Sequence, residues 1–235
     1  FVNLLKGDVG NFSPDPRLFK MAAPKSVSID DIKADDYEES TDFADYEGIP
    51  YAFELLNQLG NATYSFPSSN VLKPDYGEVL MEYAEVAFLL SENNNWSQAE
   101  YENGVRASME KWGVPSADID TFVAGLPAAN QANVLNQKYI ALYMQSHEAY
   151  AEYRRTGFPS TMFLPGDSYT LPTEQADDAG VASYTFVPAV NATDLPYRIT
   201  YPVIIQTING ANRQAAVAGL SNGDTILSKL FWDVN

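Results

Sequence analysis

The sequence predicts a mainly α-helical protein with long irregular loops and few short strands. Apolar residues recur at steps of three and four between residues 74 and 159, which is the period of amphipathic helices. Two stretches in this region end in a glycine followed two positions later by a proline, a pattern typical of helix C-termini. The flanking segments 1–72 and 160–235 are rich in Pro, Gly, Asn and Asp. We therefore expect a helical segment 73–159 between two loop-rich segments, all within part of one domain.

The first helix is expected over residues 74–92. Pro74 suits a first helical turn, and apolar side chains cover most of the circumference, so this helix should be buried between others. Glu82 and Glu85 project from the apolar body. We expect them to pair with Arg side chains or backbone groups, because an unpaired buried carboxylate is costly.

A second helix should begin after Ser97, since Ser97 and Glu100 have the spacing of a capping box. Gly113 and Pro115 end it. Two such helices with a short turn between them are typical of a tetratricopeptide-type hairpin, which needs further helices to cover its face. A shorter helix is expected over residues 116–124.

The longest helix is expected between Asn130 and Pro159. Asn130 can cap its start, while Arg154 and Arg155 suit the negative end of the helix dipole, and Gly157 can close it. One helix of roughly 25 residues would be about 38 Å long. Its apolar face would consist of Leu135, Tyr139, Leu142, Tyr143, Met144, Ala149 and Tyr153.

The loop-rich segments offer fewer elements. Residues 1–50 are expected to be mostly irregular, with Asp15-Pro16 forming a turn into an extended segment and at most one short helix among the acids of residues 30–39. After Pro159 we expect a short strand near Tyr184, a short helix over residues 213–218 and a closing amphipathic segment 225–232.

Composition excludes several functions. The chain has 235 residues and a net charge of −17, from 14 Lys and Arg against 31 Asp and Glu, so nucleic acid is a poor partner. Cysteine is absent, which removes thiolate catalysis and cysteine-based zinc sites. The single histidine, His147, has no nucleophile motif around it and does not indicate a metal site. We therefore expect no cofactor.

Sugar binding fits the composition better than catalysis. Glycoside hydrolysis, the enzyme class that acids alone could support, needs two carboxylates facing each other across a sugar, and Glu82 and Glu85 lie on one helix. Other acid pairs stay open. Aromatic residues in loops can stack on sugar rings, because loops on a helical scaffold are available to ligands. The candidate ligand-binding residues are Tyr37, Tyr46, Tyr51, Tyr64 and Trp96.

Structural roles compete with each of these assignments. Trp96 could instead cover the hairpin turn, and Tyr46 and Tyr51 could pack against the helix over residues 74–92. Arg154 and Arg155 are more readily explained by helix capping and pairing with acids such as Glu82 or Glu85 than by contact with a ligand.

An ordered set of short motifs resembles the C-terminal half of the SusD/RagB family of nutrient-binding lipoproteins of Bacteroidetes. Each motif alone is weak, but together they cover almost the whole chain in the order of the family. The motifs are Asp15-Pro-Arg-Leu18, Tyr46-Glu-Gly-Ile-Pro50, Met81-Glu-Tyr-Ala-Glu-Val-Ala-Phe-Leu-Leu90, Tyr101-Glu-Asn-Gly-Val-Arg-Ala-Ser108, Lys111-Trp-Gly113, Gln137-Lys-Tyr139, Glu152-Tyr-Arg-Arg-Thr-Gly-Phe-Pro159, Tyr197-Arg-Ile-Thr-Tyr-Pro202 and Leu230-Phe-Trp-Asp233.

This resemblance implies a SusD-like fold that acts with a TonB-dependent, SusC-type transporter at the outer membrane. It implies binding of an oligosaccharide or other nutrient, not chemistry on it. A lipidated Cys that anchors such proteins at the cell surface, and an N-terminal half of the same protein, would lie upstream. The alternatives are a glycoside-active enzyme and a structural cover of a membrane complex that binds no small ligand.

Overall fold

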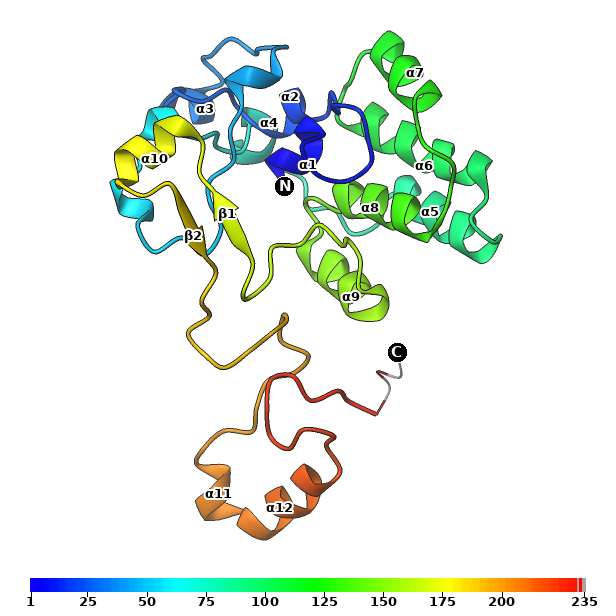
Figure 1. The fold of residues 1–235 in the computed structure, drawn as a ribbon. Coiled ribbons are helices and arrows are strands. Elements are labelled where there is room, and N and C mark those ends of the chain that lie inside the picture. The colour runs from blue at the N-terminus through cyan, green and yellow to red at the C-terminus, as the bar shows by residue number, and fades with distance from the viewer. Residues whose placement is uncertain (232, 234–235) are drawn as a thin grey trace.

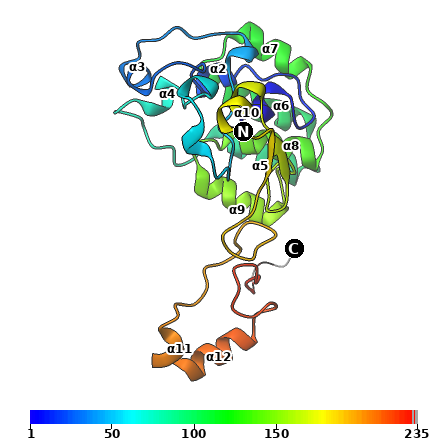
Figure 2. The same ribbon diagram turned by 60° about the vertical axis from the view of Figure 1, so that its left-hand side comes forward.

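The computed structural model describes residues 1–231 and 233. Trp232, which belongs to the closing motif and to the expected amphipathic segment 225–232, lies outside the described residues. The chain forms a helical body that includes the short strands β1 (Ser168–Thr170) and β2 (Ser183–Thr185), from which a C-terminal arm projects (Figures 1 and 2). The arm carries α11 (Ile205–Ile208) and α12 (Gly210–Ala218). The fold is mainly helical, as the sequence predicts.

A helical hairpin contributes part of the main hydrophobic core. It consists of α5 (Tyr83–Asn93) and α6 (Gln98–Lys111), and both helices pack against α8 (Gln131–Ala141). The Ser97 side chain accepts a hydrogen bond from the Glu100 amide at 3.5 Å, as the capping box predicts. α7 (Ser116–Ala124) has the predicted bounds.

Gly104 explains how closely α5 and α6 approach. A Cβ atom at this position would lie 2.8 Å from Cε1 of Phe88, which is closer than side-chain atoms pack. The ring of Phe88 therefore occupies the space that a side chain on α6 would need.

Two predicted helices have different bounds in the structure. The helix expected over residues 74–92 begins only at Tyr83, so Pro74 does not lie in its first turn. The single long helix is instead two helices, α8 and α9 (Ser146–Thr156), separated by a turn in which the Gln145 amide bonds the Leu142 carbonyl at 2.8 Å. The break follows from burial: α8 is buried on nearly all sides, whereas α9 buries only Tyr153 and leaves the core. A three-and-four period does not reveal such a turn.

The predicted ends of the broken helix are correct. The Asn130 side chain accepts a hydrogen bond from the Asn133 amide at 2.9 Å and so caps α8. Gly157 closes α9 with a φ of 72°, a conformation that favours glycine.

The first 72 residues contain more helix than expected. The extended segment predicted after Asp15-Pro16 is instead a short helix, because Arg17 and Asp15 are buried together. The Arg17 guanidinium pairs with the Asp15 carboxylate and donates to Ser108 of α6 at 2.9 Å and to Gln137 of α8. These bonds attach the segment to the helical core. The helices here are α1 (Val2–Lys6), α2 (Leu18–Met21), α3 (Ile29–Ala34) and α4 (Ser69–Leu72), with 3-10 turns at Phe43–Asp45, Leu56–Gln58 and Asn61–Thr63.

A second, smaller core lies beside the strands. β1 and β2 pair antiparallel, and α10 (Thr173–Ala179) connects them. Leu171 and Ala179 of this unit pack with Phe53 and Leu59 from the first segment. The short strand predicted near Tyr184 is β2, and the short helix predicted over residues 213–218 lies within α12.

Candidate functional site

Tyr51 lines a groove that lies between the loop of residues 48–51, α1 and the two-stranded sheet. The groove encloses a cavity of about 190 Å³. Tyr169 of β1, Tyr184 of β2 and Phe163 line its opposite side. We call this cavity the aromatic groove.

The rings of the groove form one continuous cluster. Phe163 lies 5.7 Å from Tyr184 and stacks on Phe186 at 6.0 Å, while Tyr51 meets Phe186 edge-on at 5.6 Å. Such separations are those of favourable aromatic pairs. These contacts between rings fix the positions of the cluster members. Phe186 packs against the exposed ring of Tyr51 and so restrains it.

Strand pairing places the two groove tyrosines side by side. Tyr169 is directly opposite Tyr184 in the register of β1 and β2, so both side chains project from the same face of the ribbon. Their ring centroids are 6.1 Å apart. The Tyr184 hydroxyl donates to the Tyr51 carbonyl at 2.6 Å, which connects the sheet to the loop. Burial, with a smaller contribution from Tyr169, raises the pKa of Tyr184 to about 12, so this hydroxyl stays protonated.

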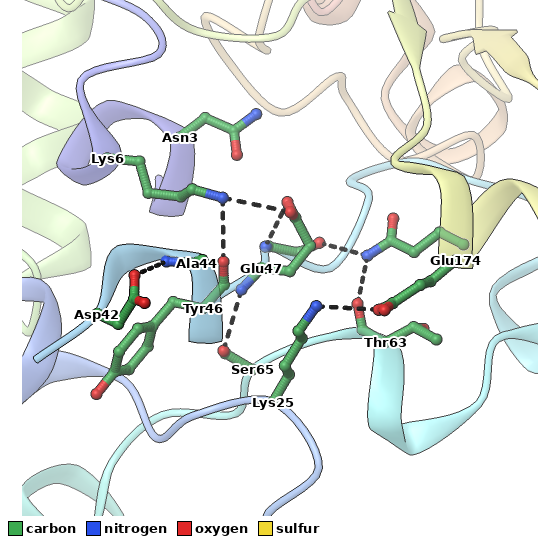
Figure 3. A network of polar contacts seen from close by, with 12 residues as sticks. Asn3, Lys6, Lys25, Asp42, Ala44, Tyr46, Glu47, Thr63, Ser65 and Glu174 are labelled. Atoms are coloured by element: carbon green, nitrogen blue, oxygen red, sulfur yellow. Dashed lines mark hydrogen bonds and ion pairs between the residues drawn. The ribbon is translucent and has the colours of Figure 1, made fainter. Parts of the chain in front are cut away.

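A polar network holds the segment that leads into Tyr51 (Figure 3). Lys6 of α1 donates to the Tyr46 carbonyl at 3.1 Å and pairs with the Glu47 carboxylate at 3.4 Å. On the other side, the Ser65 amide bonds the Glu47 carbonyl at 2.8 Å. Gln175 of α10 is fully buried.

The Gln175 amide nitrogen donates to the Gly48 carbonyl at 3.0 Å and to the Thr63 carbonyl at 2.9 Å. One side chain thus joins α10 to two loops that are distant in sequence. The backbone just before Tyr51 is consequently restrained from three directions.

The structure does not bring the five predicted binding residues together. Tyr51 lies in the groove and is 61% exposed. Tyr37 is half-buried, and its hydroxyl accepts from the Ser69 amide at 3.3 Å. Tyr64 is also half-buried and packs against the second core. Trp96 is half-buried and packs against the main core at the turn between α5 and α6. This is the alternative role, covering the hairpin turn, that the sequence suggested for it.

Tyr46 requires a correction. Its ring is completely buried against Phe19, and its hydroxyl donates to the Ser40 carbonyl at 2.8 Å. No face of this ring is free to stack on a sugar. Tyr46 instead anchors the loop, because a buried hydroxyl needs a partner and Ser40 provides it.

Sequence reasoning missed Phe163, Tyr169 and Tyr184. A signal for two of them was present, since the tripeptide Ser-Tyr-Thr occurs at both 168–170 and 183–185. These tripeptides are β1 and β2, and Ser168 and Thr185 also exchange a hydroxyl hydrogen bond at 2.8 Å across the pair. Recognising a hairpin around α10 would have placed both tyrosines on one face.

Charged residues concentrate elsewhere. Among the ion pairs between described residues, Arg154 is paired with Asp233 at 2.5 Å and Arg155 with Glu92 at 2.7 Å, rather than with the expected Glu82 or Glu85. Glu82 instead pairs with Lys111.

No carboxylate side chain is among the described residues that line the aromatic groove, so the two facing acids of a glycosidase are not found there. His147 is exposed on α9, and the described residues contain no group of three His, Asp or Glu side chains arranged for a metal ion.

Further hollows border the body, and two of them are larger than the aromatic groove. An apolar one of about 210 Å³ lies between α8 and α9 and is lined by Tyr139, Tyr143 and Tyr150. A larger polar one, of about 500 Å³, surrounds Arg154 and Arg155 near the start of the arm. Both arginines there are already paired. The aromatic groove contains Tyr51, a predicted binding residue whose ring is exposed, and is the candidate site.

A family model named SusD-like, described as starch-binding and associating with the outer membrane, matches residues 11–202. This match covers well over half of the chain. The chain belongs to the SusD-like family. Members of this family bind carbohydrate and are not enzymes, which agrees with the prediction of a non-catalytic chain. No curated protein sequence matches the chain.

Solved structures of SusD-like proteins share the fold. A SusD homologue from Bacteroides fragilis has a TM-score of 0.68 at 20% sequence identity. The matched region covers 100% of this chain and 51% of the homologue's chain. A chitin-binding protein has a TM-score of 0.60 at 22% sequence identity, and the match covers 100% of this chain and 49% of that protein's chain. A SusD homologue from Bacteroides ovatus has a TM-score of 0.60 at 21% sequence identity, and the match covers 100% of this chain and 51% of the homologue's chain. The chain thus spans about half the length of these structures.

None of the described helices combines the length and apolar character that crossing a bilayer requires.

Proposed function

We propose that the SusD-like chain binds a glycan in the aromatic groove, without chemistry, by stacking sugar rings on Tyr51 and its neighbours. The observation that supports this most directly is the exposed ring of Tyr51 beside the cluster of Phe163, Tyr169, Tyr184 and Phe186. A hollow lined by aromatic rings with a few polar groups has the character of a ligand site.

Stacking and hydrogen bonding divide the recognition. Apolar C–H faces of a pyranose pack on aromatic faces, which carry partial negative charge. The hydroxyls need polar partners, and the groove offers the Asn3 amide and the Tyr169 hydroxyl, which are already joined by a hydrogen bond of 3.1 Å that the Asn3 amide nitrogen donates. Because the network around Glu47 and Gln175 already holds the loop, little conformational entropy is lost when a glycan binds.

The wider role follows from the family. In this proposal the chain belongs to a longer surface protein, anchored at the outer membrane by an upstream lipidated Cys, that delivers its ligand to a SusC-type transporter. Coverage of about half of the solved relatives supports the presence of another half. So do the apolar side chains of the arm, since Ile199 is 92% exposed and Val203 is 79% exposed. Apolar surface of this kind is normally covered by protein.

Binding to immobilised starch and chitin tests the proposal. Tyr51→Ala should weaken binding by roughly tenfold, because stacking and apolar burial by one ring contribute on the order of 1–2 kcal/mol. Tyr83→Ala is the matched control, since Tyr83 is 62% exposed, against 61% for Tyr51, and does not line the groove. Equal binding by the two variants would refute the groove as the site. Released reducing ends would favour the glycosidase, and no affinity for any glycan would favour the structural cover.

A further inference from the structure

None of the described side chains that line the aromatic groove carries an ionised group. They are aromatic, aliphatic or neutral polar, with Asn3 and Thr161 as the polar members besides the tyrosines. In the network that supports the groove, Lys6 and Glu47 form an ion pair with each other at 3.4 Å, and their side chains are 18% and 15% exposed. Lys6 also donates to the Tyr46 carbonyl. Its charge is therefore already satisfied and is not offered to a ligand.

Cations are scarce over the rest of the molecule as well. Of 14 Lys and Arg residues, only Lys33 and Lys73 form no ion pair in the described part of the chain, and neither lines the groove. The net charge is −17. An approaching anion is repelled at long range and then meets no cationic side chain among the described residues that line the groove.

We infer that the groove selects uncharged glycans and rejects those that carry uronate, sulfate or phosphate groups, an inference that depends on the proposed function. A carboxylate or sulfate pressed against Phe163 and the tyrosines would lose hydration without gaining a charged partner. The faces of the rings are themselves electron-rich and repel an anion. Sugar C–H groups meet the same faces favourably, so one surface attracts the neutral ring and opposes the charged substituent.

A matched pair of ligands measures this selectivity. A neutral malto-oligosaccharide is compared, by calorimetry, with the same oligosaccharide after its primary alcohols are oxidised to carboxylates. We expect the oxidised form to bind at least tenfold more weakly at low ionic strength. Salt should narrow this difference in part, because salt screens the long-range repulsion but leaves the local loss of hydration.

A charge-introducing variant supplies the second readout. Thr161→Arg places a cation at the edge of the groove, and Thr161→Gln is the neutral control of greater length. The ratio of neutral to oxidised affinity should fall at least fivefold in Thr161→Arg relative to Thr161→Gln. An unchanged ratio would contradict the inference.

The possible failures are distinguishable. If the wild-type chain binds both ligands equally, or the oxidised one more tightly, and Tyr51→Ala weakens both, the charge selectivity is wrong while the groove remains the binding site. If Tyr51→Ala changes neither, the proposed site is wrong and the selectivity inferred from it is overturned too. Weak binding of the oxidised ligand together with Tyr51-dependent binding of the neutral one supports both.

Discussion

Replacing Gln175 with leucine tests whether the buried network holds the groove in shape. Leucine fills a similar volume but donates no hydrogen bond, so the carbonyls of Gly48 and Thr63 lose their partner. Each lost bond costs about 0.5–1.5 kcal/mol, and a buried carbonyl left unpaired adds to this. We expect a loss of roughly 2–4 kcal/mol in the free energy of unfolding, and a fall in melting temperature of roughly 6–12 °C for a protein of this size.

The same change should weaken glycan binding, although Gln175 does not line the groove. Loosening the backbone at Gly48 lets Tyr51 leave its supported position, and that order must be restored on binding. Urea unfolding and calorimetric titration measure the two effects. Gln58→Leu is the control, because Gln58 is exposed and surface changes usually stay within about 0.5 kcal/mol. A variant Gln175→Leu with a stability loss under about 1 kcal/mol and wild-type binding would refute the reasoning.

Three further predictions concern the helical core and its charges. Gly104→Ala should cost about 1–3 kcal/mol by overpacking against Phe88, and the double variant with Phe88→Leu should recover part of it in thermal unfolding. Arg17→Met should cost about 3–5 kcal/mol in urea unfolding, because it leaves the carboxylate of Asp15 buried without its partner; a loss as small as that of a surface variant would contradict this. Burial raises the pKa of Glu85, so the folded state keeps the carboxyl proton up to a higher pH than the unfolded state does. The free energy of unfolding therefore falls as pH rises above about 4.5. Glu85→Gln should therefore be more stable than wild type near pH 7 and equal to it near pH 4, and a pH-independent difference between them would show that Glu85 does not titrate as proposed.

The aromatic groove depends on segments that are remote in the sequence. Tyr51 comes from the first loop-rich segment, while Tyr169 and Tyr184 come from a hairpin more than a hundred residues later. Gln175, between those two tyrosines, reaches back to Gly48. The hairpin therefore both provides rings and restrains the loop opposite, which couples the stability of the second core to the shape of the site.

Local signals in the sequence determined the parts of the fold that local physics controls. The capping box at Ser97, the cap at Asn130 and the closing Gly157 act within a few residues, and each is where it was predicted. The aromatic content favoured a stacking ligand and the acidic charge disfavoured nucleic acid, and both remain predictions. The ordered motifs identified the family, which the family match confirms.

Only the tertiary structure decided which rings are available to a ligand. Tyr46 and Tyr51 are separated by four residues in one loop, yet Tyr46 is fully buried and Tyr51 is 61% exposed. The difference arises because Lys6, Ser65 and Gln175 orient that loop from outside it, and such contacts leave no trace in local periodicity. The break between α8 and α9 has the same origin: burial against neighbouring helices determines where a helix turns, and a repeat of apolar residues shows only that a helix has a face to bury.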